Sequence, residues 1–166
     1  TALIERPRKM SQLHFDTRQI HAGQRPDPTT GAPVLPIYQT SAYVFDSAEQ
    51  AANRFKLADP GPIYTRLTNP TNEVVENRIA DLEGGIAGLI VASGAGALIL
   101  TLTTIGRAGD NIVASPSLYG GSKAALTNNL PRLGIETRFV DDPRDPDAWK
   151  AAADERTVAF FGETCL

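Results

Sequence analysis

The sequence predicts an α/β protein whose mainly parallel sheet has helices on both faces. Short apolar runs alternate with longer segments of helical pattern from residue 87 onward. Glycines separate several of these segments, as turns require. The composition, 42% hydrophobic and 21% charged, is ordinary for a globular domain. Together these observations indicate successive strand–helix units, whose strands lie parallel to one another.

The predicted strands and helices alternate along the second part of the chain. Strands are expected at residues 87–92, 111–115, 135–140 and 157–161, and helices at residues 95–105, 122–132 and 146–153. The last strand runs into the final residues of the sequence, at the edge where an open α/β sheet binds its ligands. We therefore expect an incomplete sheet, and a chain that is the front part of an enzyme.

Residues 1–62 are expected to form an extended arm and a first helix that make oligomer contacts. Residues 23–36 are rich in proline, glycine and threonine, which disfavour a regular packed element. Because the arm has few apolar residues, we expect it to dock on a neighbouring subunit. Ser47 and Gln50 form a capping-box pattern, which predicts a helix over residues 48–57.

We expect the rest of the chain, residues 63–166, to be a truncated α/β domain. Near its beginning lies a second helix-start pattern. Asn69 has the character of an N-cap, and Pro70 suits the first helical position. The helix is expected over residues 70–83, and Gly84 would end it.

Charge and composition exclude several classes of partner. The formal net charge is -3 and no basic run occurs, so no nucleic-acid surface is predicted. No apolar run approaches the roughly 20 residues of a membrane span, so no membrane partner is expected. One cysteine excludes an internal disulfide, and the separated His14 and His21 predict no metal site. A cytoplasmic protein is the natural interpretation.

The turn Ser93-Gly94-Ala95-Gly96 lies where a predicted strand meets a helix. Free N–H groups and the helix dipole at such a start can bind a phosphate, and small residues let it approach the backbone. A tight turn packed against the next strand is equally consistent with these residues. The turn is no Walker A loop, since no Gly-Lys-Ser/Thr follows, and Ile99 stands where GxGxxG needs its third glycine.

Two further loops contain aromatic and basic candidates. Arg66 with Tyr64 can clamp a phosphate or a carboxylate, although an exposed arginine beside a half-buried tyrosine is also consistent. Tyr119 follows the strand of residues 111–115 and can present its ring face to a planar ligand. It can equally be a core tyrosine at the entry of a helix.

Taken in order and spacing, these segments resemble the Cys/Met-metabolism family of pyridoxal-phosphate (PLP) enzymes over nearly the whole chain. The matching blocks are Thr17–Gly23, Pro36–Ser41 with Phe45, Tyr64-Thr65-Arg66 with Asn69-Pro70-Thr71, and Leu82–Gly85. The combination is specific, although each block alone is not. Within the family, the amino-acid sequences of residues 43–49 and 161–164 are most similar to those of the O-acetylhomoserine sulfhydrylase branch. The resemblance implies part of the large domain of a fold type I PLP enzyme.

The resemblance also implies a cofactor site. Its PLP-binding residues would be Ser93, Gly94, Ala95, Tyr119, Tyr64 and Arg66. The N–H groups of Gly94 and Ala95 would hold the phosphate, although many relatives have Met or Gln in place of Ala95. Tyr119 would stack on the pyridine ring. Tyr64 and Arg66 would reach the phosphate of a second subunit in a homodimer or homotetramer, and Tyr119 and Tyr64 would be the catalytic residues.

The activity implied for the intact protein is conversion of O-acetyl-L-homoserine and sulfide to L-homocysteine and acetate. Cystathionine γ-synthase and methionine γ-lyase are the alternatives within the family. The family's Schiff-base lysine, the aspartate that pairs with the pyridine nitrogen and the C-terminal substrate domain have no match in this sequence. The lysines present are Lys9, Lys56, Lys123 and Lys150. We therefore expect residues 1–166 alone to be inactive, and a non-catalytic product that only self-associates or binds phosphate is a further alternative.

Overall fold

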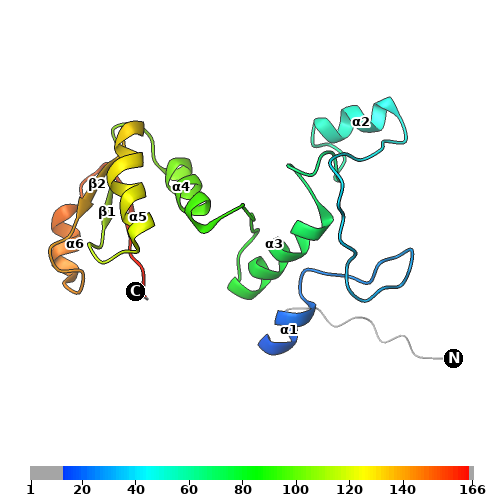
Figure 1. Ribbon diagram of the computed structural model, residues 1–166, viewed down its shortest axis with the longest axis horizontal. Helices are drawn as coiled ribbons and strands as arrows, with labels where there is room; N and C mark the ends of the chain where they lie inside the picture. The colour runs from blue at the N-terminus through cyan, green and yellow to red at the C-terminus, as the bar shows by residue number, and fades with distance from the viewer. Residues whose placement is uncertain (1–12, 165–166) are drawn as a thin grey trace. The chain divides into compact units, whose positions relative to one another are not determined.

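The computed structural model describes residues 13–164 of the chain (Figure 1). These residues belong to two compact units, Thr1–Ile90 and Val91–Leu166, and each unit is described by itself. The predicted boundary after residue 62 stays a prediction about the domains of the protein.

The first unit contains three helices and a long irregular segment. The helices are α1 (Phe15–His21), α2 (Ala48–Phe55) and α3 (Pro70–Glu83), and α1 was not predicted within the arm. Arg18 joins α1 to α3, because its Nε lies 2.8 Å from Asp81 Oδ2. Residues 22–47 contain no helix, and their only strand-like pairing is one bridge between Ala42 and Tyr64. The lack of a regular element in residues 23–36 agrees with the prediction, although Asp27 and Gly31 close a hydrogen-bonded turn there, and docking of the arm on a neighbouring subunit stays a prediction.

Local capping explains where the helices of the first unit begin. Ser47 Oγ accepts a hydrogen bond from the Gln50 N–H at 3.0 Å, and Asn69 Oδ1 accepts one from the Thr71 N–H at 2.9 Å. Helix α3 has the predicted bounds, and Gly84 ends it with φ 69°, a left-handed conformation that suits glycine. Helix α2 stops two residues before the predicted end, because Leu57 also adopts a positive φ.

The second unit is a three-stranded parallel sheet with helices. Its strands are β1 (Asn111–Ala114), β2 (Glu136–Phe139) and β3 (Thr157–Phe161), in the order β2-β1-β3. Its α-helices are α4 (Gly94–Ile105), α5 (Gly120–Ala124) and α6 (Pro146–Ala152). The three strands predicted after residue 110 and their parallel pairing are therefore confirmed.

Helices cover both faces of this sheet, as the strand–helix alternation predicts. On one face Ile112 and Ala114 pack in a buried cluster with Leu102 of α4 and Leu126. On the other face the ring of Phe160 in β3 meets Trp149 of α6 edge-on, with centroids 5.9 Å apart. Figure 1 shows α5 and α6 on opposite sides of the strands.

The helix predicted over residues 122–132 begins at Gly120 and changes geometry along its length. After α5 it continues as a π-helical turn, Ala125–Asn129, and a 3₁₀ turn, Leu130–Leu133. Pro131 has no N–H, so it cannot donate to the carbonyl of Leu126. The Thr137 hydroxyl donates to this carbonyl instead, at 3.0 Å, and thereby ties the helical run to β2.

The prediction of a strand at residues 87–92 is wrong. This segment makes no strand pairing, and Leu89 is 73% exposed. An apolar run becomes a strand only when a neighbouring strand takes up its backbone groups. No strand of the described sheet pairs with this segment, and the Ile90 N–H donates to the Glu76 carboxylate at 2.9 Å instead.

A polar network lies at the amino-terminal end of the sheet. Asp154 accepts hydrogen bonds from the Asn111 amide at 2.7 Å and from the Arg138 guanidinium at 2.9 Å. The Asn111 side chain also accepts a bond from the Thr157 hydroxyl at 2.7 Å. These bonds, the one from Asn111 first, lower the pKa of Asp154 to about 2. The network joins all three strands because its members come from β1, β2, β3 and the turn before β3.

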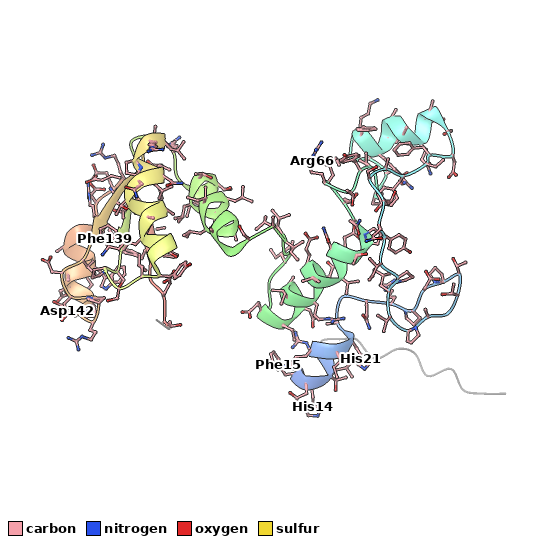
Figure 2. The ribbon with its side chains drawn as sticks, in the orientation of Figure 1. His14, Phe15, His21, Arg66, Phe139 and Asp142 are labelled. Atoms are coloured by element: carbon pink, nitrogen blue, oxygen red, sulfur yellow. The ribbon has the colours of Figure 1, made fainter. Side chains whose placement is uncertain are left out.

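Among the described residues, no helix is both long and apolar enough to cross a membrane. Nor does that part of the chain contain a cluster of three or more histidine, cysteine or acidic side chains placed to hold a metal ion. His14 and His21 lie at the two ends of α1 (Figure 2). Cys165 lies outside the described residues.

Candidate cofactor site

A cavity of about 540 Å³ opens in the second unit beside the carboxyl end of β3. It lies between the start of α4 and the start of α5, where the predicted turn and the predicted aromatic loop meet. Its lining includes Gly94, Ala95, Leu98, Tyr119, Ser122, Phe161 and Glu163. The structure thus brings together two loops that are separate in the sequence, at the edge of the sheet where ligands of open α/β folds bind.

The first turn of α4 presents backbone donors at this cavity. The Gly96 N–H donates to Ser93 Oγ at 3.0 Å, and the Ala97 N–H donates to the Ser93 carbonyl at 2.9 Å. The N–H groups of Gly94 and Ala95 have no acceptor among the described residues. A Cβ built on Gly94 would meet no atom within 4 Å. Helix α4 is twelve residues long, and the free N–H groups at its exposed start can bind an anion.

Tyr119 lies at the N-cap position of α5 and its side chain is 70% exposed. It is therefore not a core residue, which was the alternative left open by the sequence. Its ring lies close to Gly121, where an added Cβ would come within 2.7 Å of Tyr119 Cε1. An exposed ring on the wall of a cavity is free to stack on a planar ligand.

Glu163 is a residue of the site whose role the sequence did not indicate. It follows β3 by two residues and accepts two hydrogen bonds, from the Ser122 hydroxyl at 2.5 Å and from the Tyr119 N–H at 2.6 Å. These bonds, the one from Ser122 first, lower the pKa of the Glu163 carboxyl. The signals in the sequence were its position shortly after a predicted strand and its place in the family-like block of residues 161–164, and neither indicated a contact with Tyr119.

Tyr64 and Arg66 belong to the first unit, in the loop before α3. Figure 2 labels Arg66 in this loop. The guanidinium carbon of Arg66 lies 4.9 Å from the ring centroid of Tyr64, a cation–π arrangement. Hydrogen bonds from the buried Asn69 amide to Thr65 Oγ1 and to the Tyr38 carbonyl stabilise the loop. Both side chains are exposed, so the pair is available to a ligand or a second chain.

None of the lysines in the described residues lines this cavity. Lys123 Nζ lies 5.9 Å from the ring centroid of Phe139, and Lys150 Nζ lies 3.0 Å from Asp147 Oδ1. Lys56 follows α2 in the first unit. Lys123 is close to Tyr119 in the sequence, but its ammonium group is engaged at the end of β2.

Comparison with known proteins identifies the class to which this fold and site belong. The sequence profile of the Cys/Met metabolism PLP-dependent enzymes matches residues 16–165. The chain belongs to this family. The resemblance inferred from its motifs is therefore confirmed, and so is the fold class that it implied; PLP is the cofactor of the family.

Individual relatives include an O-acetyl-L-homoserine sulfhydrylase from Corynebacterium glutamicum, 54% identical over 92% of this chain and 35% of the relative. An L-methionine gamma-lyase from Treponema denticola is 45% identical over 95% of this chain and 39% of the relative. The chain therefore spans little more than a third of the length of either curated relative.

Solved structures give the same assignment. A Campylobacter jejuni protein described as an O-acetylhomoserine (thiol)-lyase matches with a TM-score of 0.83 and 38% identity, over 89% of this chain and 36% of that structure. That structure contains N'-pyridoxyl-lysine-5'-monophosphate. A cystathionine gamma-lyase from Lactobacillus plantarum matches with a TM-score of 0.79 and 36% identity, over 92% of this chain and 37% of that structure.

Proposed function

We propose that the chain is the PLP-binding part of an enzyme that converts O-acetyl-L-homoserine and sulfide to L-homocysteine and acetate. The observation that supports the proposal is the shared cavity of the Gly94–Ala95 turn and Tyr119, which offers backbone donors and an aromatic face to one ligand. Several relatives that share about half of the chain's residues are O-acetyl-L-homoserine sulfhydrylases.

The residues of the cavity fit PLP. The free N–H groups of Gly94 and Ala95 would hold its phosphate. The Ser93 hydroxyl can also donate a hydrogen bond to it, because only the oxygen of this hydroxyl is used to accept the Gly96 N–H. Tyr119 would stack on the pyridine ring and exclude water from one face. When bound, PLP supplies an electron sink that stabilises negative charge on the substrate carbon next to it.

Tyr64 and Arg66 would complete the site from a second copy of the chain. Arg66 carries a fixed positive charge that suits a phosphate, and Tyr64 supplies a hydroxyl donor close to it. We therefore propose a homodimer as the smallest functional assembly, with a homotetramer built from such dimers as the larger form. Dilution of the purified protein below the dimer dissociation constant should abolish activity, as checked by sedimentation and assay at matched concentrations.

We also propose a cytoplasmic location. The argument for it is that the sequence contains a single cysteine and therefore no internal disulfide.

Residues 1–166 by themselves are proposed to be inactive. PLP enzymes bind the cofactor covalently through a lysine. Of the four lysines of the sequence, Lys9 lies outside the described residues, and the other three do not line the cavity. Homocysteine formation by the purified 166-residue chain would contradict this proposal.

The test is an assay of the protein as its gene encodes it, supplied with PLP, O-acetyl-L-homoserine and sulfide. Homocysteine and acetate should form in equal amounts, and activity should be lost when PLP is removed. The 45% identity to an L-methionine gamma-lyase favours that activity as the second candidate. Cleavage of methionine at a rate equal to or above that of O-acetyl-L-homoserine would overturn the first assignment in favour of the second.

A further inference from the structure

The carboxylate of Glu163 connects the end of β3 to the start of α5. One oxygen accepts the Tyr119 N–H at 2.6 Å and the other accepts the Ser122 hydroxyl at 2.5 Å, across 44 and 41 residues of sequence. In a capping box, a glutamate three residues into a helix accepts the N–H of its own N-cap. Here Ser122 occupies that third position, and Glu163 supplies the missing carboxylate from another element.

This contact fixes the backbone of a residue whose side chain is held by little else. Tyr119 is 70% exposed and its N-cap position has no side-chain cap. Gly121 lies close to one edge of the ring, where an added Cβ would come within 2.7 Å of Tyr119 Cε1. Since χ1 takes only staggered values about the Cα, the anchored Tyr119 N–H, together with its carbonyl that accepts the Lys123 N–H at 2.9 Å, restricts the direction in which the ring leaves the backbone.

We propose that Glu163 is a positioning residue that holds Tyr119 in place for stacking on the pyridine ring. The inference rests on the function proposed above, because it requires PLP in this cavity. Glu163 acts through Tyr119 and Ser122. As an ionised carboxylate it forms charge-assisted hydrogen bonds, which are stronger and shorter than neutral ones. The lowered pKa of its carboxyl agrees with this state.

The experiment uses the protein as its gene encodes it, with four variants. Glu163→Ala removes both bonds, Glu163→Gln keeps an acceptor of the same shape, and Ser122→Ala removes one bond only. Glu155→Gln is the matched control. Glu155 is exposed, precedes the amino-terminal end of β3 and lines no part of this cavity. For each variant we measure the Kd of PLP, the visible circular dichroism of bound PLP at saturation, and the urea unfolding midpoint.

We expect Glu163→Ala to raise the Kd of PLP about tenfold and to change the visible circular dichroism per bound cofactor. Glu163→Gln should restore most of both signals, and Ser122→Ala should give a smaller change in the same direction. Glu155→Gln should match the unchanged protein. A role in stability alone would shift the unfolding midpoint without altering the dichroism of the saturated site.

The proposal is overturned if folded Glu163→Ala has the same Kd and the same dichroism at saturation as Glu155→Gln. If Glu163→Ala does not fold, Ser122→Ala decides, and a folded Ser122→Ala with the same Kd and the same dichroism as Glu155→Gln overturns the proposal. Failure of the unchanged protein to bind PLP is a separate result, which refutes the proposed function itself.

Discussion

Replacement of Gly121 by alanine tests whether the place of the Tyr119 ring matters for cofactor binding. The new Cβ would come within 2.7 Å of Tyr119 Cε1. Carbon atoms prefer separations of roughly 3.5–4.0 Å, so the ring must move by about 1 Å. The neighbouring Gly120 offers a matched control, because a Cβ there would meet nothing within 4 Å.

We expect Gly121→Ala to weaken PLP binding and to change the stability of the fold only slightly. Gly121 lies in the first turn of α5 without a positive φ, so alanine suits the backbone and changes stability by at most about 1 kcal/mol. Aromatic stacking contributes about 0.5–1.5 kcal/mol. Loss of this term should raise the Kd of PLP about 2- to 10-fold in Gly121→Ala and leave Gly120→Ala unchanged.

The assay is a titration of the apoprotein with PLP, followed by visible absorbance, alongside urea unfolding of both variants. Equal PLP affinity in Gly121→Ala and Gly120→Ala would refute the reasoning, because the ring would then have moved without consequence. A large loss of stability in Gly121→Ala alone would show that the ring cannot move aside as the structure suggests.

Three further predictions concern stability. Leu126→Ala should lower the free energy of unfolding by about 2–5 kcal/mol, because this side chain is fully buried, whereas Leu133→Ala at a half-exposed position should cost far less in the same urea titration. Asn69→Ala should cost more than the roughly 1 kcal/mol of the α3 N-cap, since it also removes the bonds of the buried amide to Thr65 and Tyr38, and an unchanged unfolding midpoint would contradict that role. The pKa of Asp154 is lowered from 3.8 to about 2, so its contribution to stability is present above pH 3.8 and lost as the pH falls towards 2. Asp154→Asn should therefore weaken the pH dependence of the unfolding midpoint between those values, and a variant that keeps the full dependence would count against this assignment.

Helix starts were readable from the sequence because their determinants are local. Ser47, Asn69 and Ser93 each bond an N–H two or three residues ahead, so the signal and its effect share one turn of chain. The same reasoning missed α1, which has no side-chain cap at His14. Its ties to α3 include the ion pair of Arg18 with Asp81 and the bond from Arg78 to the Ala22 carbonyl, and the sequence pattern does not reveal contacts across 63 and 56 residues.

The predicted strand at residues 87–92 failed for a related reason. An apolar run indicates a preference, whereas a strand exists only when another strand pairs with it. The described sheet contains only β2, β1 and β3, none of which pairs with this segment, and the Ile90 N–H bonds to a glutamate side chain instead.

The sequence by itself determined the family, the strand–helix order after residue 110, and the residues proposed to hold the cofactor. These properties reside in short motifs and in local backbone preferences. Only the tertiary structure brought the Gly94–Ala95 turn and Tyr119 to one cavity and placed Glu163 against Tyr119 and Ser122. Such contacts join residues far apart in the chain, and their geometry is decided by how the strands pair and how the helices pack on them.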